Sequence, residues 1–253
     1  MTLLIGNWKM APEKSTEALV LAKKTLLIAK TYKKNIQTVI CVPSIHVPIL
    51  TKNIKSTLFI GSQSVSSNTE IAQTGLVSAG MLKSYGATYC IVGHSESRLR
   101  GESDAEVLGS TNLILQKGLI PVICIGEKER DNHGWYLSAV KSQVETVVMG
   151  VPKAQLKKIV FAYEPIWAIG SNAAREATVA ECREMIIFIR KVISDVTDIK
   201  TANSIKILYG GSVNEQNASS FVLEGGAEGL LVGRVSLDAK RFGQLAKVLS
   251  NIA

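Results

Sequence analysis

Short apolar runs recur at nearly even intervals along the chain, separated by segments of mixed polarity. Each run is largely apolar along its length rather than alternating with polar residues, which is typical of a strand buried on both faces. The runs cover residues 3–7, 38–42, 58–62, 89–92, 120–125, 159–162, 205–209 and 229–232. The pattern therefore predicts eight strands of a parallel sheet.

Most of the intervening segments carry a helical pattern, in which apolar side chains fall three or four residues apart. Helices are predicted over residues 13–30 and from Trp135 to Val147. The clearest helical face follows Thr178 and consists of Val179, Cys182, Met185, Ile186, Ile189, Val192, Ile193 and Val196. Strands that alternate with helices in this way favour parallel pairing with right-handed crossovers.

Eight such units are typical of an α/β fold in which a closed (β/α)8 barrel forms a single domain over residues 1–253. A doubly wound open sheet is the alternative. In a barrel, the chemistry lies at the carboxyl ends of the strands and in the loops that follow them. The residues after each predicted strand are therefore the first candidates for a functional site.

The composition is that of an ordinary globular protein, with 46% hydrophobic and 20% charged residues. We expect a cytoplasmic protein, because no run resembles a secretory signal or reaches the length of a membrane span. The net charge of +8 is spread over separated lysines, so we expect solvated surface charge and no nucleic-acid or membrane partner. No C-x-x-C pair occurs among the scattered cysteines, which argues against a zinc site and a disulfide framework; they are Cys41, Cys90, Cys124 and Cys182.

Polar residues follow the first and fourth predicted strands. Lys9 stands just after the first strand, where a cation would meet an anionic substrate. His94 follows the fourth strand, and a short helical turn there would direct its N–H groups at the imidazole and favour the neutral ring. The alternative for His94 is a buried structural histidine, whereas His46 and His133 are expected at the surface.

A carboxylate, Glu164, ends the sixth apolar run and is followed by Pro165, which cannot continue a strand. Residues 165–170 are otherwise apolar and end in a glycine, which predicts a flap over the site. A closing flap excludes water and makes a carboxylate at its root a stronger base. Glu127, after the fifth strand, is expected in a supporting or exposed role.

The last two predicted strands end in glycine-rich sequences, Tyr209-Gly210-Gly211-Ser212 and Leu231-Val232-Gly233-Arg234. Glycine lets backbone N–H groups approach an anion closely. Loops after the seventh and eighth strands are the recurrent phosphate site of such barrels. Two such loops in these positions favour phosphate binding over plain turns.

Taken together, these motifs resemble the triosephosphate isomerase family. The stretch Tyr-Glu-Pro-Ile-Trp-Ala-Ile-Gly is highly specific, and the similarity spans the chain in the family's order. It is carried by Gly6-Asn7-Trp8-Lys9, Gly93-His94-Ser95-Glu96, residues 162–170, Tyr209-Gly210-Gly211-Ser212 and Leu231-Val232-Gly233. The resemblance implies a TIM barrel that interconverts dihydroxyacetone phosphate and D-glyceraldehyde 3-phosphate through an enediolate, without a metal or an organic cofactor.

The resemblance also implies roles for individual residues. Glu164 would remove the proton beside the substrate carbonyl, and a neutral His94 would polarise that carbonyl and move protons between the two oxygens. Lys9 would offset negative charge, Asn7 would orient the oxygens, and Glu96 would support the site. The phosphate would be held by Asn7, Lys9 and the backbone N–H groups of Gly170, Ser212, Gly233 and Arg234.

The chain departs from the family's usual sequence at the flap and at the phosphate loop. Ser171-Asn172-Ala173 stands where Thr-Gly-Lys is usual, which puts the opening rate of the flap in question more than its chemistry. Arg234 follows Gly233 where the family has a second glycine, and its backbone N–H still binds phosphate if its dihedral angles permit.

Two further departures concern a dimer interface. Ser97 replaces the first arginine after the Gly-His-Ser-Glu motif, and Leu76 replaces the glutamate of the third loop. In the family these two charges pair between subunits, so the loss of both leaves no orphan charge. We therefore expect a homodimer in which the Thr74 loop inserts near the partner's active site.

Two other functions stay open at this point. An isomerase of a related sugar phosphate, such as an erythrulose phosphate, fits the same barrel, and the altered flap end would then reflect a different pocket. A non-catalytic basic scaffold is the more remote alternative. It is disfavoured because a vestigial site has no reason to keep four separated polar residues, namely Asn7, Lys9, His94 and Glu164.

Overall fold

The computed structural model describes the chain except for residues 56, 71, 132, 171–172, 174 and 253. Its strands form one closed parallel barrel in chain order, and β1 pairs with both β2 and β8. The strands are β1 (Thr2–Asn7), β2 (Ile36–Val42), β3 (Leu58–Ser62), β4 (Tyr89–Val92), β5 (Ile120–Ile125), β6 (Val160–Tyr163), β7 (Lys206–Tyr209) and β8 (Gly229–Val232). The closed ring confirms the predicted (β/α)8 barrel and excludes the open doubly wound sheet.

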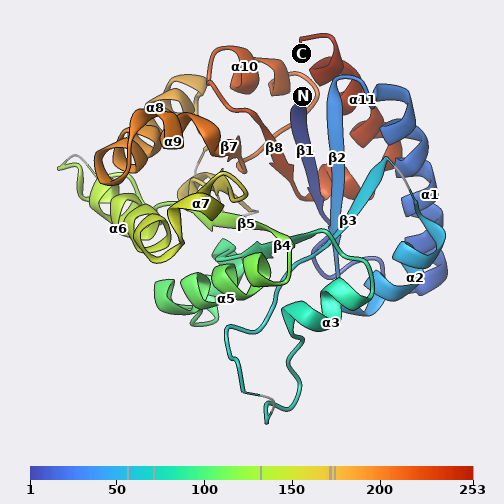
Figure 1. Cartoon of the computed structure of the whole chain (residues 1–253). Helices are drawn as coiled ribbons and strands as arrows, with labels where there is room; N and C mark the ends of the chain where they lie inside the picture. Colours follow the sequence, from blue (N-terminus) through green and yellow to red (C-terminus); the bar gives the residue numbers. More distant parts are fainter. Residues whose placement is uncertain (56, 71, 132, 171–172, 174, 253) are drawn as a thin grey trace.

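Helices surround this barrel and alternate with its strands (Figure 1). The α-helices are α1 (Ser15–Tyr32), α2 (Val47–Asn53), α3 (Ala79–Ser84), α4 (Ser95–Leu99), α5 (Asp104–Gln116), α6 (Trp135–Gly150), α7 (Lys153–Leu156), α8 (Val179–Val196), α9 (Ile199–Ser204), α10 (Ala218–Leu223) and α11 (Ala239–Ser250). Short 3₁₀ turns follow three strands: η1 (Ser44–His46), η2 (Ile166–Ala168) and η3 (Arg234–Leu237).

The predicted elements are all present, with small differences at their ends. The sixth strand begins at Val160 rather than Ile159, because the Ile159 N–H donates back to Leu156 in the turn that ends α7. The helix after Thr178 is α8. The Thr178 side chain accepts the backbone N–H of Glu181, and the Glu181 carboxylate accepts the backbone N–H of Thr178. This reciprocal cap satisfies two backbone donors that a helix start leaves free.

The apolar core has two layers because successive strand residues point to opposite faces. One cluster contains strand residues alone and fills the barrel; it consists of Leu3, Ile5, Val39, Cys41, Tyr89, Ile91, Val122, Cys124, Val160, Ala162, Leu208 and Leu231. The other cluster joins the outward-facing strand residues, such as Leu4 and Phe161, to the helices. These two layers require strands that are apolar on both faces, which is what the sequence pattern predicted.

One surface prediction is wrong. His46 is only 2% exposed, and its Nε2 lies 2.8 Å from the carbonyl oxygen of Pro12. The carbonyl after β1 supplies a polar partner that allows the imidazole to be buried beside α2. His133 is exposed, as expected.

Close packing of the backbone at the carboxyl ends of the strands places Glu164. Its N–H donates to the Ile125 carbonyl at the end of β5 at 2.8 Å. A Cβ at Gly126 would lie 1.8 Å from the Glu164 carbonyl oxygen, so no larger residue fits there. Gly93, which precedes His94, has a φ of 68° that favours glycine. Two glycines thus permit the strand ends that present Glu164 and His94.

Candidate active site

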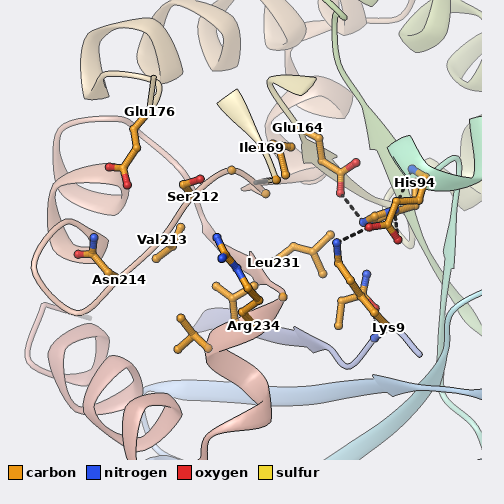
Figure 2. A pocket seen from close by; sticks show the side chains of 18 of the residues that line it. Lys9, His94, Glu164, Ile169, Glu176, Ser212, Val213, Asn214, Leu231 and Arg234 are labelled. Carbon is orange, nitrogen blue, oxygen red and sulfur yellow. Dashed lines mark hydrogen bonds and ion pairs between the residues drawn. The ribbon is translucent and has the colours of Figure 1, made fainter. Parts of the chain in front are cut away.

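A cavity of about 670 Å³ opens at the carboxyl ends of the strands, and its lining includes every residue that the sequence predicted for the site (Figure 2). Asn7, Lys9, His94, Glu96 and Glu164 form one end, where Figure 2 shows the His94 and Glu164 side chains facing each other. The phosphate candidates line the rest, namely Gly170, Ser212, Gly233 and Arg234.

Glu164 is a buried carboxylate, only 3% exposed, at the foot of the flap. Its Oε2 accepts the backbone N–H of Ser95 at 3.1 Å, and its Oε1 lies 3.4 Å from Nε2 of His94. The thiol of Cys124, a barrel-interior residue, is also close: burial raises the pKa of Cys124, and the adjacent Glu164 carboxylate raises it further. The thiol therefore stays protonated and adds no charge beside Glu164.

The contacts of His94 determine its tautomer. His94 is the N-cap of α4, and its Nδ1 accepts the Glu96 backbone N–H at 3.2 Å. A ring nitrogen that accepts a hydrogen bond carries no proton, so the proton of the neutral ring lies on Nε2. That N–H faces the cavity and Glu164. The helical turn expected after the fourth strand is present as α4, and its Glu96 N–H points at the imidazole.

Lys9 lies at the same end of the cavity as His94 (Figure 2). Its backbone N–H donates to Oδ1 of Asn7 at 3.0 Å, and its φ of 52° is rare for a residue other than glycine. The Lys9 ammonium contacts Glu96 at 2.5 Å. Partial burial raises the pKa of Glu96, but the hydrogen bond and the charge of Lys9 outweigh this and hold it below its ordinary value. Lys9 and Glu96 thus form an ion pair at the mouth.

The flap begins in the short turn η2 and is hydrogen-bonded to residues of the barrel on both sides. Trp167 Nε1 donates to Oε1 of Glu127 at 2.7 Å, and the Tyr163 hydroxyl donates to the same oxygen at 2.8 Å. On the other side, the Ser212 hydroxyl donates to the Ala168 carbonyl at 3.0 Å. Ser212 thus both lines the cavity and contacts the flap.

Glu127 is buried, at 2% exposed, and fulfils the supporting alternative of the sequence prediction. Burial raises the pKa of Glu127, while the hydrogen bonds from Trp167 and Tyr163 and the charge of Arg130 oppose the rise. A carboxylate that holds both a strand tyrosine and the flap tryptophan joins the start of the flap to the end of β6.

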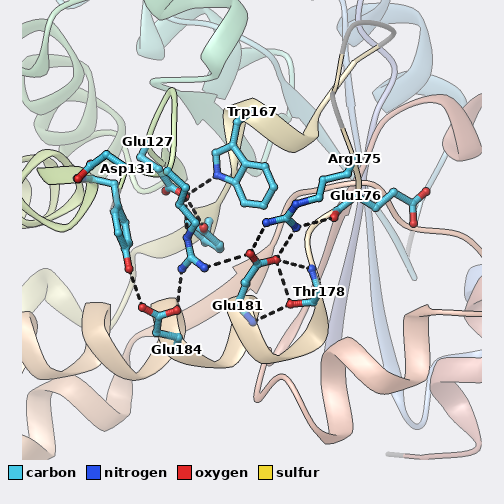
Figure 3. A network of polar contacts seen from close by, with 11 residues as sticks. Glu127, Asp131, Trp167, Arg175, Glu176, Thr178, Glu181 and Glu184 are labelled. Carbon is cyan, nitrogen blue, oxygen red and sulfur yellow. Dashed lines mark hydrogen bonds and ion pairs between the residues drawn. The ribbon is translucent and has the colours of Figure 1, made fainter. Parts of the chain in front are cut away.

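Polar contacts continue from Trp167 to the start of α8 (Figure 3). The Arg175 guanidinium stacks 4.5 Å from the Trp167 ring centre and pairs with both carboxylate oxygens of Glu181, at 2.9 and 2.6 Å. Arg130 contacts Glu181 at 3.3 Å and Glu184 at 2.8 Å. We call Glu127, Arg130, Trp167, Arg175, Glu181 and Glu184 the flap network. Of the altered flap end, Ser171 and Asn172 lie outside the described residues.

Several contacts at the site were not predicted from the sequence. Ser95 acts through its backbone N–H, a group that every residue except proline carries. Cys124 belongs to the fifth apolar run, and only the structure shows that it also lies beside Glu164. Arg175 forms its contacts across a loop that has no periodic pattern. A signal existed only for Glu181, which stands three residues after the capping Thr178.

Within the part of the chain that the structure describes, no group of three or more His, Cys, Asp and Glu residues is arranged to hold a metal ion. All four cysteines are buried and free. Among the described helices, none combines the length and the apolar character needed to cross a membrane.

Comparison with known proteins yields one consistent result. A family model described as triosephosphate isomerase matches residues 2–249. The chain is also similar to the triosephosphate isomerase of Natranaerobius thermophilus, with 37% identity over 251 residues that cover 98% of this chain and 95% of that protein.

Proposed function

The chain belongs to the triosephosphate isomerase family, and from this premise we propose that it interconverts dihydroxyacetone phosphate and D-glyceraldehyde 3-phosphate in the cavity described above. It is thus an isomerase, and its substrate is a small phosphorylated molecule. The observation that carries the proposal is the juxtaposition of a buried carboxylate with an imidazole, Glu164 Oε1 and His94 Nε2 being 3.4 Å apart.

Glu164 is the base. Its carboxylate takes the proton from the carbon next to the substrate carbonyl, and the electrons of that C–H bond form the enediolate. The same carboxylate then returns a proton to the neighbouring carbon, which gives the other isomer. The Ser95 N–H holds the Glu164 carboxylate in the free site by a hydrogen bond. This hydrogen bond must break when the carboxylate moves to the substrate.

His94 and Lys9 stabilise the charge that develops on the substrate oxygens. The Nε2–H of His94 donates to the carbonyl oxygen and moves a proton between the two oxygens, while Nδ1 remains held by Glu96. The Lys9 ammonium and the Asn7 side chain face the same oxygens, and Glu96 fixes Lys9 by its ion pair. These groups are positioned before the reaction, so little reorganisation opposes the charge shift.

The phosphate group lies at the other end of the cavity. We assign its binding to the backbone N–H groups of Gly170, Ser212, Gly233 and Arg234. Asn7 and Lys9 contribute from the neighbouring end, since the Cε of Lys9 lies beside Gly233. The flap closes over the substrate and excludes water, which strengthens Glu164 as a base and keeps the enediolate from losing its phosphate.

We further infer a cytoplasmic, single-domain protein of residues 1–253 that forms a homodimer through the Thr74 loop. Large apolar side chains are exposed after each of the neighbouring strands β1 to β4, and these loops lie on one side of the barrel. The exposed residues are Met10 at 93%, Ile45 at 77%, Leu76 at 50% and Leu99 at 73%. An exposed apolar surface of this kind favours contact with the same surface of a second copy of the chain over contact with water.

The proposed reaction is tested by steady-state rates of the purified chain on dihydroxyacetone phosphate and on an erythrulose phosphate. A kcat/KM at least about tenfold higher on the triose phosphate supports the assignment. The reverse order would instead identify an isomerase of the longer sugar phosphate. Turnover of neither substrate would leave the basic scaffold as the remaining interpretation.

A further inference from the structure

We propose that the Arg234 side chain, and not only its backbone N–H, binds the phosphate of the substrate and makes the cavity selective for doubly charged ligands. The inference rests on the function proposed above and adds to it a side-chain cation at the phosphate end. The family's usual glycine at this position has no side chain, so the contact is specific to chains that carry a cation there.

Arg234 is well placed for this role. It is the first residue of η3, directly after Gly233 at the end of β8. Figure 2 shows its side chain extending into the cavity toward Ser212, away from the end that holds Glu164 and His94. The preceding residue, Gly233, has no side chain; a Cβ at Gly233 would lie 3.4 Å from the Cε of Lys9.

Arg234 also differs from neighbouring cations in its partners. Arg241 lines the same cavity but pairs with Glu215 at 3.0 Å, and Lys9 pairs with Glu96 at 2.5 Å. In the part of the chain with described placement, the Arg234 guanidinium has neither a carboxylate partner nor a hydrogen-bond acceptor. It is therefore the cavity cation that an anionic ligand could pair with directly.

The charges that line the cavity favour such a cation. Glu96 offsets Lys9, and Glu215 offsets Arg241, so these pairs leave little net field. Two other lining carboxylates, Glu164 and Glu176, repel a phosphate dianion. Among the described lining residues, Arg234 supplies the positive charge that opposes these two carboxylates, and it stands at the end where we assign the phosphate.

The chemistry of the guanidinium fits this ligand. Its planar N–H groups match two phosphate oxygens at once, and such charge-assisted bonds are stronger than those between neutral groups. Backbone N–H groups satisfy other oxygens and give the phosphate its place, while the arginine supplies net charge. A singly charged ligand gains less from the same cation, which is the basis of the selectivity.

The test measures binding of glycerol 3-phosphate, a phosphate ester without a carbonyl, by calorimetry at fixed ionic strength. Arg234→Ala and Arg234→Gly are compared with Lys240→Ala, which removes one exposed positive charge nearby on α11 but outside the cavity. We expect the Kd to rise about tenfold in both Arg234 variants and to stay within about twofold in Lys240→Ala. Arg234→Lys should recover part of the loss.

Kinetics on the same variants give a second readout. The KM for the triose phosphate should rise with the Kd while kcat changes by less than about threefold, because the phosphate contact serves ground state and transition state alike. Equal Kd values for Arg234→Ala and Lys240→Ala would overturn the inference. Wild-type protein that binds glycerol 3-phosphate but isomerises no triose phosphate would instead refute the proposed function and leave the Arg234 contact standing.

Discussion

The backbone N–H of Ser95 donates a hydrogen bond of 3.1 Å to the Oε2 of Glu164. The residue that holds the proposed base thus belongs to the same turn that fixes the tautomer of His94 through the Glu96 N–H. One short helix, α4, therefore positions both the carboxylate and the imidazole. Any change that shifts Glu164 relative to this turn should reduce turnover more than it reduces stability.

Gly210→Ala tests how closely Glu164 is positioned. A Cβ at Gly210 would lie 2.9 Å from Cγ of Glu164, so the carboxylate must move. We expect kcat to fall by about 10²-fold, because small displacements of a catalytic group are costly. The control is Gly80→Ala, where a Cβ meets no atom closer than 3.7 Å. Equal kcat values for the two variants would show that the placement of Glu164 is not critical.

The protonation of His94 can be observed directly. At pH 7, nitrogen NMR of the ring should show a protonated Nε2 and a bare Nδ1, because Nδ1 accepts the Glu96 N–H. Signals of a ring protonated on both nitrogens would contradict the neutral electrophile. His94→Gln should lower kcat by about 10²-fold, whereas His133→Gln, which alters an exposed histidine, should leave it unchanged.

The flap network predicts a specific side reaction. Arg175→Ala removes both the stacking on Trp167 and the pair with Glu181, so the flap should close less firmly. The enediolate would then lose inorganic phosphate several-fold more often per turnover, which a phosphate assay of the reaction mixture detects. Arg183→Ala removes an exposed arginine of α8 and serves as the control. An unchanged phosphate yield in Arg175→Ala would mean that the network does not hold the flap.

The same network predicts a dependence of stability on pH. Hydrogen bonding to Arg175 outweighs partial burial and lowers the pKa of Glu181 from 4.5 to about 2. The ionised carboxylate therefore stabilises the fold fully above pH 4.5, and this contribution is lost as the pH falls toward 2.

Glu181→Gln should lower the free energy of unfolding by about 1 kcal/mol at pH 7. The difference in unfolding free energy between the variant and wild type should shrink as the pH falls from 4.5 toward 2. Chemical denaturation at several pH values measures it. A difference that stays constant down to the lowest pH would contradict the role of the Glu181 charge.

The proposed dimer makes a prediction that needs no kinetic model. Wild-type protein should elute from gel filtration as a dimer at micromolar concentration. Leu76→Arg should shift it to a monomer of low activity, because a charge then enters the apolar surface after β3. Leu223→Arg changes another exposed leucine, on α10, and should remain dimeric. A fully active wild-type monomer would refute the dimer.

The fold followed from the sequence because its strands are buried on both faces, which leaves continuous apolar runs that are easy to recognise. The site candidates followed from the barrel, since residues after strands must meet at one end. His46 was misplaced because burial of a histidine depends on a distant partner, the Pro12 carbonyl, which no local pattern reveals.

Contacts made by the backbone or across irregular loops also could not be predicted from the sequence. The Ser95 N–H has no side-chain signature, and the stacking of Arg175 on Trp167 depends on the course of the flap. For Arg234, the sequence indicates a cation where glycine is usual, but only the structure shows the side chain in the cavity.

The most direct test of the account is the isomerisation rate of Glu164→Asp and Glu164→Gln beside wild type, with glycerol 3-phosphate binding measured on each. Shortening or neutralising the base should lower kcat by about 10²-fold or more while the Kd for glycerol 3-phosphate stays nearly unchanged. A Glu164→Asp variant that isomerises triose phosphate at the wild-type rate would contradict the assignment of Glu164 as the base.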